Sequence, residues 1–153
     1  MTYFAYGANM AEGVMGAFCP GHRLLGPAEL PEHRLAFSRR SVRTGTGVAD
    51  LVPAPGRSVW GILYEVDDTG LEALDAKEGN SWAYDRTEVA VRPAGREPRV
   101  WAVTYRVREP EAAEVTPSRA YVEGLIQAAR DRGLPADYVA ELEARRPALL
   151  RDF

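Results

Sequence analysis

The stretch from Ser58 to Val66 is the feature that most limits how this chain can fold. Its side chains alternate between two faces with the period of a β-strand. One face carries large apolar residues, namely Trp60, Ile62, Tyr64 and Val66. The other face carries Leu63, so apolar residues lie on both sides. The pattern therefore predicts a central strand with a sheet built around it.

Short segments with the composition of strands occur on both sides of this stretch. We expect strands at Thr2 to Tyr6, Leu24 to Leu30, His33 to Ser38, Gly47 to Val52, Tyr84 to Val91 and Val100 to Val107. The pair Pro31-Glu32 and the segment Pro53-Ala54-Pro55-Gly56 predict turns. The chain is therefore expected to hold about six or seven short strands.

Helix signals lie between the strands and after them. Thr116 as N-cap and Pro117 at the first helical position predict a helix that stops at Gly133-Leu134-Pro135. Further helices are expected from Leu71 to Gly79, with an N-cap in Asp67-Asp68-Thr69, and from Ala136 to Arg145. The segment from Ala11 to Ala17 is expected to be a short helix or an irregular segment.

These elements predict an α+β fold in a single domain that spans residues 1–153. The natural arrangement is a small, mixed and mostly antiparallel β-barrel with two or three flanking helices. A chain of 153 residues with 46% hydrophobic residues can bury a core without disulfides.

Composition also narrows the partners and the compartment. The net charge of −3 gives no reason to expect nucleic acid or a membrane surface as a partner. The single cysteine, Cys19, fits a reducing compartment and is expected to be buried. The first residues lack the features of a signal peptide, and no apolar run is long enough for a transmembrane helix. We therefore expect a cytoplasmic protein.

A carboxylate occupies an apolar position near the end of a predicted helix. Leu71, Leu74 and Glu78 are spaced i, i+3, i+7, so they share one stripe. A carboxylate on such a stripe must be paired, protonated or used in chemistry. The pattern alone favours an ion pair with an arginine or a frayed helix end, and leaves a catalytic role open. Trp82 and Tyr84 follow closely and are expected to shield this position from water.

Other polar residues have structural explanations from the pattern alone. Asp75 is expected to cap a helix or to pair with an arginine. Tyr121 lies on an apolar helix stripe and is expected in the core. The segment Gly7-Ala8-Asn9-Met10 predicts a tight turn after the first strand. Its backbone N–H groups can form an anion-binding nest, although the pattern alone favours an ordinary strand-to-helix turn.

Four motifs occur in the order and spacing of a known family. They are Tyr6-Gly7-Ala8-Asn9, Leu74-Asp75-Ala76-Lys77-Glu78-Gly79 followed by Tyr84-Asp85-Arg86, Pro117-Ser118-Arg119-Ala120-Tyr121, and Gly133-Leu134-Pro135. With these motifs the chain resembles the gamma-glutamyl cyclotransferase family, including its AIG2-like members. The resemblance covers nearly the whole chain. One position departs from it, because Ala8 stands where the family usually has serine.

The resemblance implies cleavage of a gamma-glutamyl amide by internal attack, which gives 5-oxoproline and a free amine or amino acid. It implies no metal or cofactor, and the partner is a small gamma-glutamyl substrate of a monomer or homodimer. Glu78 is then the general base and general acid. The substrate-binding residues are then Tyr6, Gly7, Ala8, Asn9, Met10, Ala11 and Tyr121, with Tyr84 and Tyr105 as further candidates for the pocket wall.

The leaving group stays open between an amino acid, an amine such as the lysine-linked isopeptide, and a protected biosynthetic intermediate. The basic stretch Arg39-Arg40, with Arg43, is typical of a solvated face, and recognition of an acidic leaving group is the alternative. The departure at Ala8 leaves a second function open, namely a non-catalytic domain of the same fold that binds a small molecule or a partner.

Overall fold

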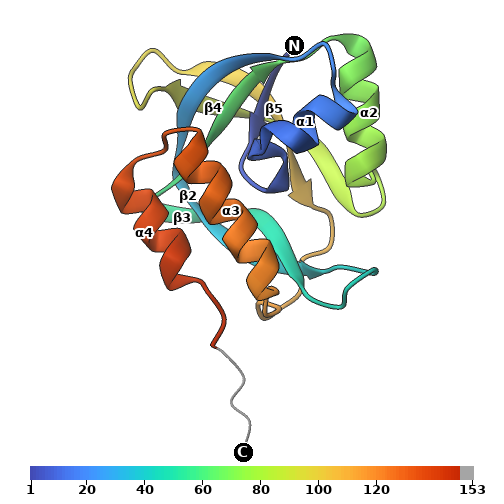
Figure 1. The fold of residues 1–153 in the computed structure, drawn as a ribbon, viewed down its shortest axis with the longest axis vertical. Helices are drawn as coiled ribbons and strands as arrows, with labels where there is room; N and C mark the ends of the chain where they lie inside the picture. The colour runs from blue at the N-terminus through green and yellow to red at the C-terminus, as the bar shows by residue number, and fades with distance from the viewer. Residues whose placement is uncertain (149–153) are drawn as a thin grey trace, which may run out of the picture.

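A closed five-stranded barrel forms the centre of the molecule, with the strand order β1-β3-β2-β4-β5 (Figure 1). The structure is a computed structural model that describes residues 1–148. The predicted domain of residues 1–153 therefore includes five positions, 149–153, that lie outside the described residues. The strands are β1 (Thr2–Ala5), β2 (Arg23–Arg40), β3 (Gly47–Glu65), β4 (Tyr84–Pro93) and β5 (Val100–Val107).

The barrel is mostly antiparallel, as the sequence predicts. β1 pairs antiparallel with β3, β2 pairs antiparallel with β3 and β4, and β4 pairs antiparallel with β5. Closure comes from a parallel contact between β1 and β5, where Tyr3 lies opposite Val103. The predicted central strand forms the second half of β3 and lies between β1 and β2.

The prediction of six or seven short strands is wrong, because β2 and β3 each absorb two predicted strands. The pair Pro31-Glu32 makes no chain reversal; it marks a register shift between Pro31 and His33, with Glu32 at φ 61°. Gly56 lies across this bulge and donates its N–H to the Glu32 carboxylate at 3.0 Å. The prolines therefore bend a long hairpin at a bulge without ending its strands.

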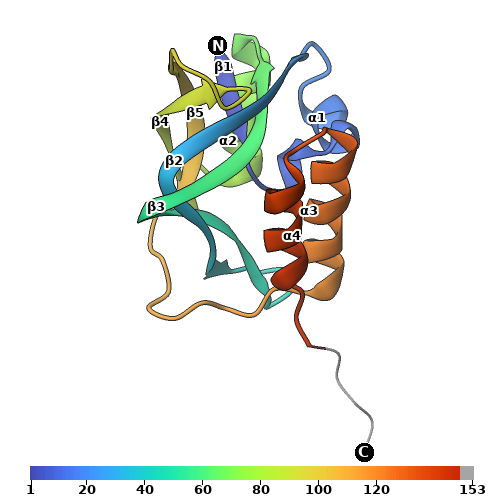
Figure 2. The same ribbon diagram turned by 90° about the vertical axis from the view of Figure 1, so that its left-hand side faces the viewer.

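Helices cover the barrel at two places. They are η1 (Ala8–Met10, a 3-10 helix), α1 (Glu12–Phe18), α2 (Asp68–Glu78), α3 (Arg119–Asp131) and α4 (Ala136–Ala144). α3 and α4 lie side by side against one flank of the barrel (Figure 2). Their buried faces are apolar stripes, with Val122, Leu125, Ile126 and Ala129 from α3 and Tyr138, Val139 and Leu142 from α4. Within residues 1–148, none of the helices has the length and apolar character needed to cross a membrane.

The predicted start of α3 at Thr116-Pro117 is wrong by two residues. Ser118 is the N-cap, and its hydroxyl accepts the N–H of Tyr121 at 3.1 Å. The preceding residues cannot begin a helix because their backbone is engaged elsewhere. The carbonyl of Thr116 accepts the N–H of Gly47, and the N–H of Val115 donates to Phe37.

The ends of α2 follow the predicted capping pattern. The Asp67 side chain accepts the N–H of Gly70 at 2.7 Å, which satisfies one free donor of the first turn. Gly79 ends the helix in the left-handed conformation at φ 64°. Leu71 and Leu74 are buried on the inner face. These caps place the last turn of α2, and with it Glu78, at a defined point beside the barrel.

Asp50 is a buried carboxylate that joins two strands. It is 3% exposed, and its Oδ1 accepts the N–H groups of Leu51 at 2.8 Å and Val107 at 2.9 Å. The start of β3 is thereby tied to the end of β5. Burial raises the pKa of the Asp50 carboxyl, even though the hydrogen bonds from Val107, Ser38 and Leu51 act in the opposite direction.

We predict that Gly79→Ala lowers the free energy of unfolding by about 1–2 kcal/mol, because a β-carbon disfavours left-handed backbone. That β-carbon would also lie 2.5 Å from the Trp82 ring. Gly124→Ala is the matched control, since Gly124 is exposed in α3 and its β-carbon meets no atom within 4 Å. The control should gain about 0.5–1 kcal/mol in urea unfolding. Equal effects of the two substitutions would contradict the prediction.

We predict that Asp50→Asn raises the free energy of unfolding at pH 7 by about 1 kcal/mol, because the amide oxygen keeps both hydrogen bonds without a buried charge. Below the unfolded-state pKa of about 3.9, both states of the wild type are neutral and the gain vanishes. The gain grows as the pH rises through the higher folded-state pKa. Urea unfolding of both proteins at a series of values between about pH 4 and about pH 8 measures this gain. Asp85→Asn is the control, because its carboxylate is half exposed beside Arg108; a loss of stability in Asp50→Asn at pH 7 would contradict the prediction.

Candidate active site

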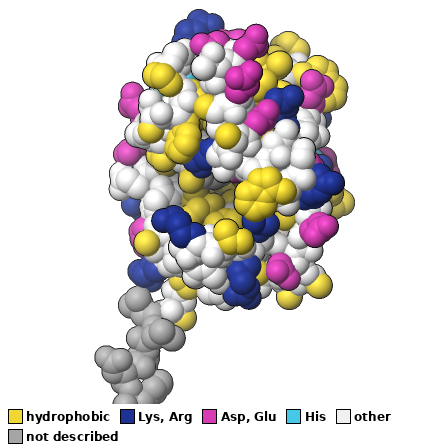
Figure 3. All heavy atoms as spheres, turned by 90° about the vertical axis from the view of Figure 1, so that its right-hand side faces the viewer, with side chains coloured by type: hydrophobic (Ala, Val, Ile, Leu, Met, Phe, Trp, Pro, Cys, Tyr) yellow, Lys and Arg dark blue, Asp and Glu magenta, His cyan; other side chains and the backbone are white. Residues whose placement is uncertain are grey.

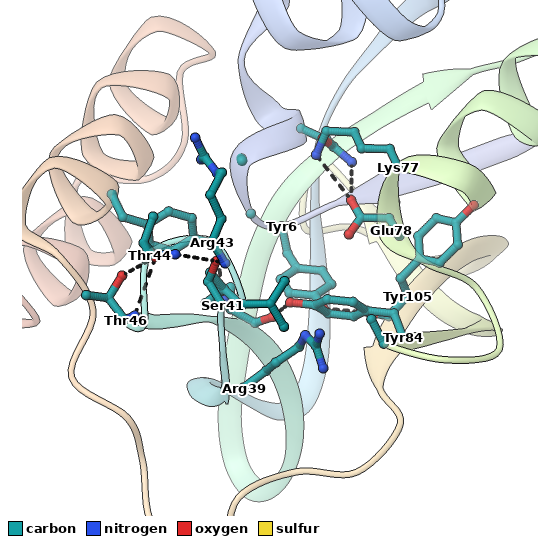
Figure 4. A pocket seen from close by; sticks show the side chains of 18 of the residues that line it. Tyr6, Arg39, Ser41, Arg43, Thr44, Thr46, Lys77, Glu78, Tyr84 and Tyr105 are labelled. Carbon is teal, nitrogen blue, oxygen red and sulfur yellow. Dashed lines mark hydrogen bonds and ion pairs between the residues drawn. The ribbon is translucent and has the colours of Figure 1, made fainter.

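The carboxylate of Glu78 is held by two neighbours through one of its oxygens. Its Oε1 accepts a hydrogen bond from Asn9 Nδ2 at 2.8 Å and lies 3.5 Å from Lys77 Nζ. The side chain is 18% exposed. Within residues 1–148, Oε2 of Glu78 has no hydrogen-bond partner, and Figure 4 shows the carboxylate at the wall of a cavity. The predicted ion pair with an arginine is therefore wrong, since the nearby cation is the neighbouring lysine.

Asn9 links this carboxylate to the barrel. It lies in η1, directly after β1, and is 3% exposed. The same Nδ2 donates to the hydroxyl of Tyr3 at 2.8 Å. Burial, and next the charge of Glu78, raise the pKa of the Tyr3 hydroxyl well above its usual range. Asn9 therefore orients Glu78 against a neutral, buried phenol.

The tight turn predicted at residues 7–10 forms as η1, without positive φ angles in the described structure. Side chains from other elements hold η1 in position through hydrogen bonds to the carbonyl of Met10, its last residue. This carbonyl accepts the hydroxyl of Tyr64 at 2.8 Å and Nε of Arg132 at 3.4 Å. Arg132 follows the last turn of α3, so the barrel and a helix together hold η1 in place.

A cavity of about 670 Å³ lies beside Glu78. Its walls come from β1, η1, the end of α2, the loop of residues 41–46 and the start of α3 (Figure 4). It opens on the face shown in Figure 3, where hydrophobic side chains lie in a hollow with Lys and Arg side chains around it. This volume falls in the range of small-molecule sites, about 300–1,000 Å³.

The structure places seven of the predicted substrate-binding residues on the cavity wall, namely Tyr6, Gly7, Ala8, Asn9, Tyr84, Tyr105 and Tyr121. Met10 and Ala11 do not line it, and their binding of substrate stays a prediction. Met10 is fully buried in the core, and Ala11 packs against that core. The 3-10 turn directs both side chains toward the core and away from the cavity.

Three of the tyrosines on the wall already use their hydroxyl protons. Tyr6 donates to the carbonyl of Tyr105, and Tyr84 donates to the carbonyl of Ala49 at 2.8 Å. Tyr105 donates to Asp75 Oδ1 at 2.6 Å. Burial raises the pKa of all three hydroxyls, so they stay protonated. They are placed to shape the wall more than to exchange protons.

Asp75 forms the predicted pair with an arginine. Its Oδ2 accepts from Arg86 Nη1 at 2.7 Å, while Oδ1 accepts from Tyr105. Both oxygens are therefore occupied, and Asp75 does not line the cavity. It supports the wall from behind.

Tyr121 differs from the other wall tyrosines. Its oxygen accepts the N–H of Ala49 at 3.1 Å. Burial raises the pKa of this hydroxyl to about 12, against the lowering effect of that N–H bond. Among residues 1–148 no acceptor is bonded to its hydroxyl proton, which is therefore available to a ligand. The prediction of a core position holds in part, because Tyr121 is half-buried and packs against the core while its tip borders the cavity.

Trp82 does not shield Glu78 as predicted. It lines the cavity mouth but is 65% exposed, and the guanidinium of Arg39 lies 5.5 Å from its ring centre. Its ring packs against Gly79, at the end of α2, and remains largely in solvent. Cys19, by contrast, is buried as predicted.

The sequence did not single out several residues of the wall. Those that matter most are Tyr3 and Lys77, together with the hydroxyl-bearing residues Ser41, Thr44 and Thr46. Tyr3 carried one weak signal, since it is a polar-tipped aromatic residue in the same strand as Tyr6. Arg39 and Arg43 were noted only as part of a basic stretch that is typical of a solvated face. Their place on the cavity follows from the long β2–β3 hairpin.

Comparison with known proteins agrees with the barrel and the cavity. The sequence model of the AIG2-like family matches residues 58–142, which is more than half of the chain. The chain therefore belongs to the AIG2-like family.

Its similar proteins include named enzymes. The gamma-glutamylcyclotransferases of Homo sapiens and Bos taurus are 30% and 29% identical to it over 151 residues, which covers 95% of this chain and 78% of each relative. A solved structure of a gamma-glutamyl cyclotransferase matches it with a TM-score of 0.87 at 26% identity, covering 100% of this chain and 92% of that one. The resemblance drawn from the four motifs and the predicted barrel are both confirmed.

Proposed function

We propose that this chain is a cofactor-independent gamma-glutamyl cyclotransferase, which converts a gamma-glutamyl amine or gamma-glutamyl amino acid to 5-oxoproline and a free amine. The observation that carries the proposal is the state of Glu78. It is the one carboxylate among residues 1–148 that lines the cavity, with one oxygen anchored and the other unbonded. The names of the relatives agree with this activity.

In the proposed reaction, the α-amine of the glutamyl group attacks its own side-chain carbonyl. A carbon–nitrogen bond forms within the ring, and the amide bond to the leaving amine breaks. Glu78 takes the proton that the attacking amine loses and returns it to the leaving nitrogen, so protons balance over one turnover. Because the attack is intramolecular, a wall that holds the substrate in a ring-closing shape contributes much of the acceleration.

The donors proposed for this reaction come from the turn that lies beside Glu78. We assign the segment Gly7-Ala8-Asn9 to the substrate carboxylate or the developing oxyanion, through backbone N–H groups. Met10 and Ala11 keep this turn in place through their contacts with the core. Tyr121 lies beside Gly7 and offers its free hydroxyl proton to the same anion. Tyr6, Tyr84 and Tyr105 form the remaining wall around the glutamyl chain.

We predict that Glu78→Gln lowers kcat by about 10²–10⁴-fold, because the amide cannot accept the proton. The measurement is 5-oxoproline by mass spectrometry after incubation with gamma-glutamyl amino acids and gamma-glutamyl amines. Glu72→Gln is the matched control, since Glu72 is exposed on the same helix and does not line the cavity. It should retain wild-type rates.

Full activity of Glu78→Gln on every accepted substrate would contradict the role of Glu78 as general base and general acid. Thermal stabilisation by these compounds without any 5-oxoproline would instead support a non-catalytic binding domain of the same fold. The departure at Ala8 is the reason to consider that alternative. The two outcomes are read from the same set of compounds.

We predict that Ala8→Ser changes kcat/KM by less than about threefold, because one added hydroxyl is a small term beside backbone donors already in place. Ala8 is exposed on the cavity wall, so a serine fits there without a clash with the core. Steady-state rates of the variant and the wild type measure the effect. A gain of tenfold or more would show that the family's serine hydroxyl supplies a bond that this chain lacks, tenfold being about 1.4 kcal/mol.

A further inference from the structure

The charge on the cavity wall is unbalanced. Among residues 1–148, three cations line it, namely Arg39, Arg43 and Lys77, against the single carboxylate of Glu78. Lys77 lies 3.5 Å from Glu78 and compensates it. The charges of Arg39 and Arg43 therefore have no counterpart on the wall.

Arg39 is held in place without an acidic partner. It is half-buried near the end of β2, and its guanidinium lies 5.5 Å from the Trp82 ring centre. Within residues 1–148 no carboxylate lies within 4 Å of its nitrogens. A guanidinium stacked on an aromatic ring keeps its donors free at the edges. Other arginines of the barrel, such as Arg86 and Arg92, are paired with carboxylates.

Arg43 projects from a loop that is braced by its own hydrogen bonds. The hydroxyl of Ser41 accepts the N–H groups of Arg43 at 3.3 Å and Thr44 at 3.4 Å. The hydroxyls of Thr44 and Thr46 are 2.8 Å apart. Arg43 also has no carboxylate within 4 Å in the part of the chain that the structure describes. The loop thus presents a second unpaired cation at the mouth.

Both arginines lie across the cavity from Glu78 (Figure 4). The basic stretch predicted as a solvated face is thereby divided. Arg40 is exposed, bonds to the carbonyl of Gly45 at 2.7 Å and stays outside the cavity, whereas Arg39 and Arg43 line it. If the glutamyl group lies between Glu78 and Gly7, then the leaving group faces these two guanidinium groups.

We propose that Arg39 and Arg43 form a subsite for an acidic amino acid as leaving group, so that the preferred substrates are gamma-glutamyl dipeptides of glutamate or aspartate. This inference rests on the proposed function. The glutamyl head carries one ammonium and one carboxylate, which cancel. An acidic leaving group adds two carboxylates, which match the two uncompensated guanidinium groups on the wall.

The test compares three substrates that differ in the number of carboxylates on the leaving group. They are gamma-glutamyl-glutamate with two, its near-isostere gamma-glutamyl-glutamine with one, and gamma-glutamyl-butylamine with none. We expect kcat/KM for gamma-glutamyl-glutamate to exceed that for gamma-glutamyl-glutamine by at least about fivefold, since an extra partly desolvated ion pair is worth about 1 kcal/mol. A smaller ratio overturns the proposal.

The double variant Arg39→Gln/Arg43→Gln should bring this ratio to within about twofold of one. Arg96→Gln/Arg57→Gln is the matched control, because both residues are exposed arginines outside the cavity and their removal changes net charge equally. The control should keep the wild-type ratio. A double variant that keeps the wild-type ratio, or a control that loses it, overturns the subsite.

A second measurement does not depend on how well the variants fold. The substrate ratio of the wild type should fall as NaCl rises from about 20 mM to about 500 mM, because salt screens charge pairs near the surface. A ratio that does not change with salt overturns the proposal. Failure of the proposed function gives a different result, because none of the three substrates then yields 5-oxoproline.

Discussion

Closure of the barrel by β1 is the constraint on which the site depends. This strand has four residues, yet it pairs with β3 on one side and with β5 on the other. The hydroxyl of Thr104 donates to the Phe4 carbonyl at 2.8 Å, and the hydroxyl of Tyr6 donates to the carbonyl of Tyr105. Because η1 follows β1 directly, this closure fixes Asn9 beside the end of α2.

The contact between Asn9 and Glu78 joins segments that are 69 residues apart. It is made at a cost, because Oδ1 of Asn9 is buried and has no hydrogen-bond partner in the described part of the chain. An unsatisfied buried acceptor destabilises a fold by about 1–3 kcal/mol. The same amide holds one oxygen of Glu78 and the hydroxyl of Tyr3. This contact therefore fixes the Glu78 carboxylate at some cost to the stability of the fold. Sites that position reactive groups commonly carry such a cost.

The parts of the fold that depend on local sequence signals could be predicted, whereas the parts that depend on pairing between distant segments could not. The caps at Asp67 and Gly79 depend on a few neighbouring residues, so α2 could be predicted closely. The bulge at Glu32 depends on the strand opposite, which is why proline and glycine signals suggested turns within one hairpin. In the site, Glu78 could be singled out from its helix stripe and its motif. The position of Arg39 on the same cavity could not, because it requires the register of β2 against β3.

The parallel pairing of β1 with β5 also has a consequence during synthesis. The contact between Thr104 and Phe4 spans 100 residues, so β1 leaves the ribosome long before its neighbour exists. At about 5–20 residues per second, the first strand waits about 5–20 seconds for that neighbour. Its apolar side chains must stay covered by other segments or by chaperones in that interval. The cavity wall is therefore complete only late in synthesis, since Tyr105 lies in β5 and Tyr121 lies in α3.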